Sequence, residues 1–433
     1  MFRKFHRLLI FIFIGLILLP VYSEAIKVVS WNICNFPGTT GASREDDFRK
    51  VLEQLQPDIL VVQEMVNQFG LDQFLNNILN HSFPDTYGAA PFFDSTYSDN
   101  ALFYKKSVIR IISHQQITTA LRDISEYYLE ILEGPEKGTK FRIYSVHLKA
   151  GSSPSDKEKR DEEAKILRDF LNGLPKNSLF LVCGTFYMQS SKENAFKILT
   201  GRQKDNDGRT KDPLGTKGKW PKRKHRLIQT QSTRTSNFGG GYGGGLDDRF
   251  DLILTSYGFK RSEELAYVAD SYVAYGNDGK HFNKAVNDGK NKSVSNDIAD
   301  ALYEASDHLP VIIELKLPEI KPKPGDWSSK TDFGKFEFAV SPGSDGIKYV
   351  KLIFSNWRGR SGWVSITPST PWAISNSKFD INVSFSLDPW NPWNKEDWTF
   401  KGTFSSSKKA SGTWKAVISG GTYSGSWTAK PKK

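Results

Sequence analysis

Five short motifs place acidic, amide or imidazole side chains where apolar runs begin or end. The motifs are Val29–Asn32, Pro57–Glu64, Tyr144–Lys149, Arg249–Asp251 and Ser306–Pro310. Carboxylate oxygens suit hard divalent cations, and an imidazole beside a carboxylate can transfer protons near neutral pH. Each motif alone is weak, because a strand-end glutamate usually lies in solvent and a lone histidine is usually structural. Their shared position at strand ends is the informative feature.

The order and spacing of these strand ends resemble the endonuclease/exonuclease/phosphatase superfamily. The carrying residues are Asn32, Glu64, His147 and the pair Asp307-His308. The superfamily includes pancreatic-type deoxyribonucleases, abasic-site endonucleases, inositol-phosphate phosphatases and secreted sphingomyelinases. The resemblance covers nearly all of residues 26–317 and is nearest to secreted bacterial members. It implies a four-layered α/β/β/α sandwich, in which helices flank two mixed β-sheets.

The resemblance also implies a metal site. Glu64, helped by Asn32 and Asp307, is expected to hold one Mg²⁺ or Mn²⁺ ion. Such an ion prefers oxygen ligands, keeps several of its waters and neutralises charge on a phosphate group.

Further roles follow from the resemblance. His308 matches the histidine that acts as base or polarises the phosphate, Asp251 would orient it, and His147 matches the second histidine. A carboxylate behind an imidazole fixes its tautomer and stabilises its charged form. Substrate contacts are expected from Asn100, Arg122 and Lys149.

One motif departs from the family pattern. The family reads Gly-Asp-Phe-Asn where this chain reads Gly184-Thr185-Phe186-Tyr187, between intact flanks. The Asp normally positions the attacking water and the Asn stabilises the transition state, so both functional side chains at these catalytic positions, Thr185 and Tyr187, are replaced. Losing an acid–base group costs about 10²–10⁴-fold in rate. Two outcomes stay open: a weakened or inactive enzyme, or slow turnover through His308 with Tyr187 donating a hydrogen bond.

The intervening elements alternate between strands and helices. Apolar, β-branched runs predict strands, two amphipathic stretches predict helices, and Ser43 is a plausible cap for the first helix. The predicted strands are Ile26–Trp31, Ile59–Gln63, Ala101–Tyr104, Tyr127–Leu132, Phe141–His147, Leu179–Cys183, Phe250–Thr255 and Val311–Leu315, and the helices are Glu45–Leu55 and Asp156–Leu171. The 127–132 and 141–147 runs are expected to be antiparallel neighbours.

The first 25 residues read as a signal peptide. Arg3, Lys4 and Arg7 precede an apolar run over Leu8–Leu19, which is too short for a comfortable membrane span. We therefore expect a secreted protein, extracellular or periplasmic, without a transmembrane anchor; an uncleaved N-terminal anchor is the alternative.

A Pro/Lys-rich linker over residues 318–325 separates the superfamily-like domain, 26–317, from residues 326–433. This last region holds nine of the eleven tryptophans and 15 Lys and Arg against 8 Asp and Glu. Its short alternating runs predict a small all-β sandwich domain. It carries no catalytic motif, and its surface ligand, whether sugar, cell wall or protein, is left open, as is the oligomeric state.

The charge is uneven within the first domain as well. Gly201–Arg226 holds ten Lys and Arg against three Asp and Glu, with Trp220 among them. Cations beside an aromatic ring can bind nucleic acid by charge and stacking, although a solvated insertion has the same composition. Gly239–Gly245 could form a flap over the site. Cys34 and Cys183 rule out a disulfide-rich scaffold, and two buried thiols are expected.

Three functions fit these observations. The first is a secreted, metal-dependent phosphodiesterase, an endonuclease of the deoxyribonuclease type with weakened activity. The second is a phospholipid or inositol-phosphate hydrolase of the same fold. The third is an inactive protein that binds nucleic acid or phosphate. The basic run favours nucleic acid, and no long apolar hairpin for membrane insertion is present near the site.

Overall fold

The computed structural model describes residues 25–94, 99–134, 136–262, 264–316, 320–375, 377–386, 395–418 and 421–432. All but the last residue of the expected signal peptide lies outside this part of the chain. No helix among the described residues is both long and apolar enough to cross a membrane.

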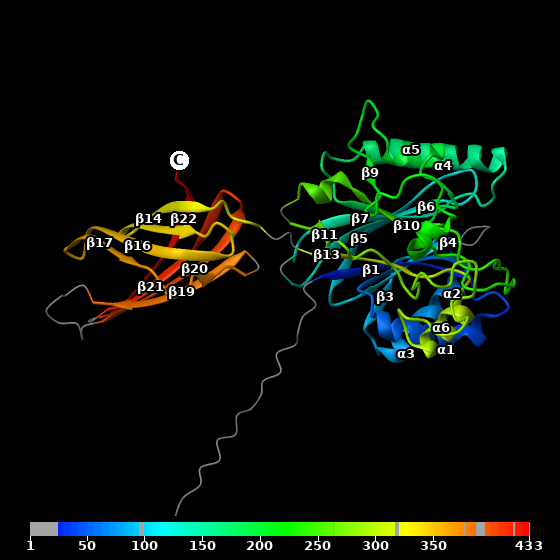
Figure 1. The fold of residues 1–433 in the computed structure, drawn as a ribbon, viewed down its shortest axis with the longest axis horizontal. Helices are drawn as coiled ribbons and strands as arrows, with labels where there is room; N and C mark the ends of the chain where they lie inside the picture. The colour runs from blue at the N-terminus through cyan, green and yellow to red at the C-terminus, as the bar shows by residue number, and fades with distance from the viewer. Residues whose placement is uncertain are drawn as a thin grey trace, which may run out of the picture.

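Two sheets form the first domain (Figure 1). The seven-stranded sheet has the order β11-β13-β1-β2-β4-β3, with β12 also paired to β13. Its strands are β1 (Ile26–Phe36), β2 (Ile59–Met65), β3 (Tyr87–Ala89), β4 (Asp99–Lys105), β11 (Ala266–Tyr267), β12 (Val273–Ala274) and β13 (Val311–Lys316). Strand β1 runs parallel to β2 and antiparallel to β13.

The six-stranded sheet has the order β5-β6-β7-β8-β10-β9. Its strands are β5 (Ile109–Ile117), β6 (Ile124–Ile131), β7 (Lys140–His147), β8 (Phe180–Thr185), β9 (Thr210–Lys211) and β10 (Asp251–Ser256). Strands β7 and β8 are parallel and the other pairs are antiparallel, including the predicted β6–β7 pair.

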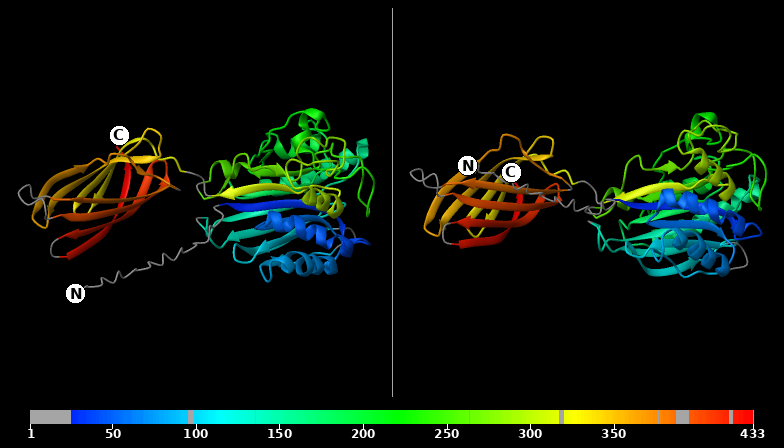
Figure 2. Two further views of the ribbon diagram at one scale, coloured as in Figure 1. Left: turned by 60° about the horizontal axis from the view of Figure 1, so that its bottom comes forward. Right: turned by 90° about the horizontal axis from the view of Figure 1, so that it is seen from below.

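Helices cover the outer face of each sheet (Figures 1 and 2). They are α1 (Gly41–Leu55), α2 (Gln68–Gln73), the π-helical turn η1 (Phe74–Leu79), α3 (Asn80–Ser82), α4 (Pro154–Asn172), α5 (Asn194–Thr200) and α6 (Asn296–Ala305), with 3₁₀ turns η2 (Arg223–Ile228) and η3 (Tyr257–Lys260). One apolar cluster lies between the sheets, and one lies between each sheet and its helices. The predicted four-layered sandwich is therefore confirmed.

Several element boundaries differ from the prediction, among them the end of β1, the start of α1 and the start of α4. Strand β1 continues to Phe36, because a register shift after Asn32 lets Phe36 pair with Met65. Helix α1 begins after Thr40, so Ser43 lies inside the helix and is not its cap. Helix α4 begins earlier than predicted, where Ser153 and Asp156 form a capping box.

Residues from Gly325 onward form one nine-stranded sheet, so the all-β prediction is confirmed (Figure 2). Its order is β17-β16-β15-β14-β22-β21-β20-β19, with β18 on β16. The strands are β14 (Gly325–Thr331), β15 (Gly334–Val340), β16 (Gly346–Trp357), β17 (Arg360–Ile366), β18 (Trp372–Ala373), β19 (Lys378–Phe385), β20 (Glu396–Ser406), β21 (Lys409–Ile418) and β22 (Gly421–Pro431). The sheet curves until its halves pack together, and Phe336 of β15 stacks on Phe400 of β20 at 4.2 Å.

A row of residues across four strands shows how this core is filled. Phe379, Gly402, Gly412 and Trp427 are consecutive register partners on β19, β20, β21 and β22. The two aromatic rings stack at 5.8 Å over the glycines. A Cβ atom on Gly402 would lie 2.3 Å from Cζ of Phe379, so the row has room only for hydrogen there.

Part of the predicted linker is attached to the C-terminal sheet. The amide of Ile320 donates to Oγ of Ser377 at 3.1 Å, and the amide of Lys323 donates to the carbonyl of Ser407 at 2.8 Å. Residues 320–323 thus belong with the β-rich unit and are not wholly solvated, whereas 317–319 lie outside the described residues.

Candidate active site

The predicted catalytic and metal-binding side chains meet at one edge of the two sheets. Parallel pairing brings the carboxyl ends of β1 and β2 together in one sheet and those of β7 and β8 together in the other. Strands β10 and β13 run the opposite way in their sheets, so their amino ends reach this same edge. The residues brought there are Asn32, Glu64, His147, Thr185, Asp251, Asp307 and His308.

The centre of the site is a chain of hydrogen bonds between β8, β10 and His308, which lies three residues before the start of β13. Nδ1 of His308 lies 2.7 Å from Oδ2 of Asp251, and Oγ1 of Thr185 donates to Oδ1 of Asp251 at 2.8 Å. Burial lowers the pKa of His308, but the carboxylates of Asp251, Asp307 and Glu64 outweigh it and raise that pKa to about 9. An imidazolium at this position could contact a phosphate oxygen through Nε2.

Asn32 holds the strand-end carboxylate in place. Its Nδ2 donates to Oε1 of Glu64 at 2.9 Å and to Oγ1 of Thr185 at 3.1 Å, while its Oδ1 accepts from the amide of Cys34 at 3.0 Å. Oε2 of Glu64 accepts from the amide of Asn35 at 2.9 Å. Asn32 therefore orients Glu64, and its predicted role as a metal ligand stays a prediction.

Glu64 itself has a strained backbone. Its φ of 67° lies in the left-handed region, where non-glycine residues cost about 1–3 kcal/mol. A register shift between Val62 and Met65 marks the irregularity in the β2–β4 pair. In a regular strand the Glu64 side chain would point to one face of the sheet. The irregularity turns the carboxylate toward the centre of the site instead.

The carboxylates of Glu64 and Asp307 lie near enough to each other for their charges to interact. Burial and then the charge of Asp307 raise the pKa of Glu64. Oδ2 of Asp307 accepts from Nε2 of Gln231 at 2.7 Å and from the amide of Tyr242 at 2.8 Å. A pair of buried carboxylates that repel one another fits a Mg²⁺ or Mn²⁺ ion that retains water ligands. No cluster of three or more His, Cys, Asp and Glu side chains suited to a metal occurs among the described residues.

His147 lies on the other side of Glu64. Its Nε2 is 3.4 Å from Oε1 of Glu64, and neither ring nitrogen has a hydrogen-bond partner in the described part of the chain. Burial, with smaller contributions from Arg122 and His308, lowers the pKa of His147 well below its usual value. His147 is therefore a neutral imidazole beside the cationic His308.

Tyr187 covers this cluster. Its backbone φ is 51°, and its ring lies 5.7 Å from His147, 6.5 Å from His308 and 5.2 Å from Phe250. Burial and the nearby carboxylates raise the pKa of its hydroxyl, which stays protonated. The side chains behind it are nearly inaccessible, with exposed fractions of 1% for His308 and 4% for Asp307.

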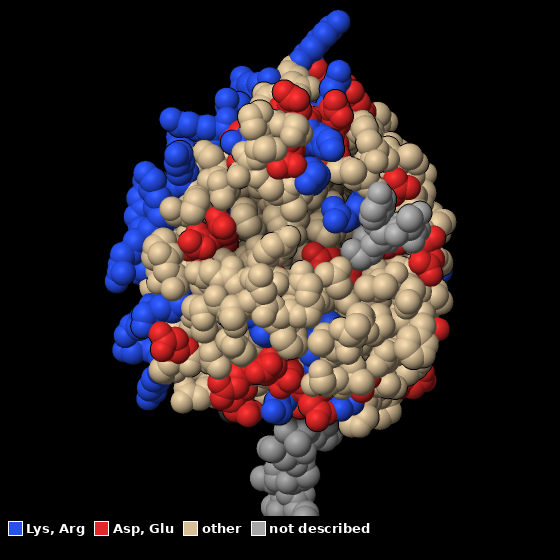
Figure 3. All heavy atoms as spheres, turned by 90° about the vertical axis from the view of Figure 1, so that its right-hand side faces the viewer, with Lys and Arg blue, Asp and Glu red and all other residues tan. Residues whose placement is uncertain are grey.

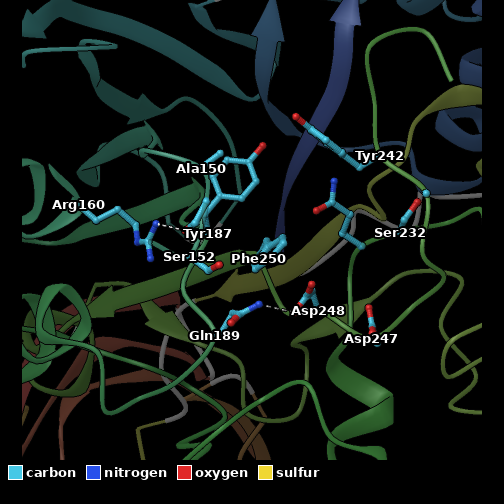
Figure 4. A pocket seen from close by; sticks show the side chains of 13 residues that line it. Ala150, Ser152, Arg160, Tyr187, Gln189, Ser232, Tyr242, Asp247, Asp248 and Phe250 are labelled. Carbon is cyan, nitrogen blue, oxygen red and sulfur yellow. Dashed lines mark hydrogen bonds between the residues drawn. The ribbon is translucent and has the colours of Figure 1, made fainter. Parts of the chain in front are cut away.

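The adjoining pocket, of about 350 Å³, lies on the outer side of Tyr187 (Figure 4). Tyr187 and Phe250 form one wall, and Tyr242, Gln231 and Ser232 line another, while Asp247 and Asp248 lie at the rim. Burial and the neighbouring Asp247 raise the pKa of Asp248 to about 7. His308, Asp251 and Glu64 do not line this pocket, although the Glu64 side chain is 12% exposed.

The structure places the three predicted substrate contacts in different surroundings. Arg122 lies near the cluster, since its charge acts on both His147 and Tyr187. Asn100 is 3% exposed; its Nδ2 donates to the carbonyl of Asp123, and its Oδ1 accepts from Oγ of Ser145. The ammonium of Lys149 pairs with Asp156 at 2.9 Å. Arg122 is thus close enough to the cluster to act on its charges, and the roles of all three residues as substrate contacts stay predictions.

Two contributors were missed by sequence reasoning. Nε2 of Gln231 lies 2.8 Å from Nε2 of His308 and also donates to Asp307. Gly241 packs against the carboxylate, because a Cβ there would lie 2.7 Å from both Cγ of Asp307 and Sγ of Cys34. The glycine run that contains Gly241 predicts a loop near the site. It does not indicate that this loop packs against Asp307.

The cysteines and the tryptophan of the basic run are buried. Cys34 and Cys183 are free thiols, as expected. Trp220 is fully buried, and its ring packs against Phe196 at 5.3 Å with the guanidinium of Arg249 over it at 5.1 Å. The expectation that Trp220 could stack on a nucleic-acid base is therefore wrong.

Comparisons with known proteins found similar solved structures and one family. Similar solved structures include D. rerio TDP2 complexed with single strand DNA product, with 16% identity, a TM-score of 0.45 and coverage of 68% of this chain and 99% of that one. The human Nocturnin catalytic domain with bound sulfate anion has 17% identity, a TM-score of 0.42 and coverage of 68% and 95%. Staphylococcus aureus beta toxin has 17% identity, a TM-score of 0.41 and coverage of 66% and 99%.

A search of curated proteins found no significant match. The model of the endonuclease/exonuclease/phosphatase family matches residues 29–308, from the strand that carries Asn32 to His308 itself. Well over half of the chain is matched, and the chain belongs to the endonuclease/exonuclease/phosphatase family.

Proposed function

We propose that the protein is an exported, divalent-metal-dependent phosphodiesterase of the endonuclease type, with weakened turnover. The observation that carries the proposal is the His308–Asp251 pair, at 2.7 Å, held in one cluster with Glu64 and Asp307. A cationic imidazole and two carboxylates in one buried cluster suit the chemistry of phosphoric esters.

Glu64 and Asp307 are the residues that would hold a Mg²⁺ or Mn²⁺ ion. Such an ion, when bound, neutralises the charge that develops on the phosphate oxygens. Asp251 keeps a proton on Nδ1 of His308. Nε2 of His308 lies 2.8 Å from the amide nitrogen of Gln231, so a protonated Nε2 can donate to a phosphate oxygen once the Gln231 side chain turns away. His147, being neutral, can accept a proton or donate one hydrogen bond to the leaving group.

Weak turnover follows from two replacements. The hydroxyl of Thr185 already donates to Asp251, and a hydroxyl carries no charge with which to take a proton from water at neutral pH. Tyr187 stands between the pocket and His308. Loss of one acid–base group and of one charge-stabilising donor each lowers a rate by about 10²–10⁴-fold.

The burial beneath Tyr187 also favours a second candidate. A protein that keeps the fold and the carboxylate pair but never exposes His308 would bind phosphate compounds without hydrolysing them. Digestion of a diester in a metal-dependent manner separates these candidates.

The assay uses purified residues 25–433 with plasmid DNA, single-stranded DNA, sphingomyelin vesicles and inositol phosphates, each with Mg²⁺, Mn²⁺ or EDTA. The expected result is slow, metal-dependent cleavage of nucleic acid that disappears in His308→Ala. Cleavage of lipid or inositol phosphate alone would replace the nuclease assignment with the second enzyme class. If no substrate is cleaved in a metal-dependent manner, the second candidate, a phosphate-binding protein without activity, is supported.

Export remains part of the proposal, and its support is the basic, then apolar composition of residues 1–25. The N-terminal sequence of the protein recovered from culture medium or periplasm tests it. A mature chain that starts near Ile26 is expected, and a chain that retains Met1–Ala25 inside the cell contradicts it.

A further inference from the structure

A set of seven exposed cations forms what we call the basic surface. They belong to two segments of the first domain: Lys219, Lys222, Arg223, Lys224 and Arg226 from one, and Lys280 and Lys292 from the other. None of the seven forms an ion pair with any described residue. Lys and Arg gather along one edge of the hollowed face in Figure 3.

Specific contacts hold the two segments together. Nδ2 of Asn277 donates to the carbonyls of Arg226 and Gln229, at 2.9 and 2.8 Å. A Cβ on Gly279 would lie 2.7 Å from Cδ2 of Leu227 and 3.3 Å from Cγ of Arg226, so the glycine backbone packs against these two side chains. The basic surface is therefore a built feature of the fold and not a loose charged loop.

The carboxylate of Asp278 holds the backbone of Lys280 and that of Lys292 together. Oδ1 of Asp278 accepts from the amide of Lys280 at 2.8 Å, and its Oδ2 accepts from the amide of Lys292 at 3.0 Å. Both ammonium groups are exposed, and each lies near enough to the other for Lys292 to lower the pKa of Lys280. Asp278 is the carboxylate beside these two ammonium groups, and like charges held this close gain further by contact with a polyanion.

The basic surface leads into the active site along a single segment. Arg226 ends the basic part of the 3₁₀ turn η2, and five residues later Gln231 contacts His308 and Asp307. Five residues span at most about 18 Å. An anionic chain on the basic surface would therefore run close to the pocket beside Tyr187.

The composition of the surface selects among polyanions. Trp220 is buried, and the half-buried imidazole of His225 is the one aromatic ring that the described residues between Lys219 and Ile228 offer near the surface. Leu227, 59% exposed, is the large apolar side chain among the cations, which is too little for insertion into a membrane interface. A surface in which cations far outnumber aromatic and apolar groups matches the phosphate backbone of a duplex.

We propose that the basic surface docks the phosphate backbone of double-stranded nucleic acid beside the active site. The inference deepens the proposed endonuclease by naming a duplex as its substrate, and it rests on that function for every step after docking. Docking itself needs neither a metal nor catalysis.

The test is fluorescence anisotropy of full-length mature protein with a labelled 20-base-pair duplex in EDTA at several salt concentrations. Wild type should bind with an affinity that falls steeply with salt, by about 0.9 in log–log slope for each phosphate contacted. The triple variant Lys222→Gln, Lys224→Gln, Lys280→Gln should bind at least tenfold more weakly at 0.1 M salt and show a shallower slope.

A matched triple variant controls for net charge. Lys137, Lys140 and Lys316 are exposed, take part in no ion pair among the described residues, and lie at the ends of β7 and β13 away from His308. Changing these three to Gln should alter affinity less than twofold. Equal weakening in both triple variants, or no weakening in the first, would overturn the proposal.

Two further arms separate the alternatives. Tighter binding of a single strand than of the duplex, or binding to phosphatidylserine vesicles but not DNA, would also overturn it. Hydrolysis of the small activated diester bis(p-nitrophenyl) phosphate reports the site alone. Duplex binding without any such hydrolysis would refute the proposed hydrolase and leave docking intact.

Discussion

Thr185 and Asp251 face each other directly across the β8–β10 pair, and the Thr185 hydroxyl donates a 2.8 Å hydrogen bond to the Asp251 carboxylate. This contact uses the one oxygen of Asp251 that His308 leaves available. A carboxylate at position 185 could not make that bond and would turn instead toward the imidazolium or a bound cation. With threonine at position 185, this side chain helps to hold Asp251, which in turn orients His308.

The double change Thr185→Asp, Tyr187→Asn should raise metal-dependent diester hydrolysis by about 10²-fold or more. The first change returns a charged acceptor beside His308, and the second removes the ring that covers it. Initial rates with a diester substrate and Mg²⁺ or Mn²⁺ measure the gain.

Two controls accompany this variant. His308→Ala in the restored background should abolish the gain, and Thr185→Val with Tyr187→Asn should open the pocket without supplying the carboxylate. A rate for the valine variant equal to that of the aspartate variant would show that access alone, and not the carboxylate, limits the reaction.

Glu64→Gln should weaken Mn²⁺ binding by at least tenfold, because it removes one of the two carboxylates that face each other at the site. Isothermal titration calorimetry measures the change. Glu53→Gln, on the exposed face of α1, should bind as wild type does. Equal Mn²⁺ affinity in the Glu64 variant and wild type would remove Glu64 from the metal site.

Glu163 predicts a pH effect on stability. Burial raises the pKa of this carboxyl to about 7, although Oε2 accepts from the Lys149 amide; Oε1 has no partner among the described residues. The folded state therefore holds the proton more tightly than the unfolded state. The stabilisation is complete below about pH 4.5 and is lost as the pH rises to about 7, with an upper limit of about 3 kcal/mol.

Glu163→Gln keeps an acceptor for Lys149 and cannot ionise. Its melting temperature should match that of wild type near pH 4.5 and exceed it at pH 8. Glu162→Gln, exposed on the same helix, should show no such pH dependence. A melting difference for Glu163→Gln that stays constant from pH 4.5 to 8 would contradict the raised pKa.

The first domain could be predicted from the sequence because its polar site residues follow apolar strands directly. Asn32, Glu64 and His147 each end a run whose alternation and β-branching are local properties. Gln231 could not be assigned in this way. It lies between helices and strands, and its contacts with His308 and Asp307 depend on packing of segments 77 and 76 residues apart.

The position of the Tyr187 ring over the site could not be predicted from the sequence for a different reason. Tyr187 points across His308 because its backbone has a φ of 51°, which sequence patterns do not indicate for a tyrosine. Trp220 lies in a charged run without periodicity, yet it is fully buried against Phe196. Both cases involve a side chain whose direction is set by tertiary contacts.

Gly402→Ala should destabilise the C-terminal sheet by about 1–3 kcal/mol, because the new methyl group would overlap the rings of Phe379 and Trp427. Denaturant unfolding followed by tryptophan fluorescence measures this loss. Thr403→Ala, at the exposed neighbouring position, should change stability by about 0.5 kcal/mol or less. Equal stabilities of the Gly402 variant and wild type would show that the row can open to admit a side chain.

The attachment of Ile320 and Lys323 to the C-terminal sheet shortens the tether between the two units. The chain from Lys316 to Ile320 spans at most about 14 Å. Any surface held by the β-rich unit would then meet the catalytic unit at an effective concentration in the millimolar range or above. A slow enzyme gains most from such enforced proximity, since each substrate stays within reach for many unproductive encounters.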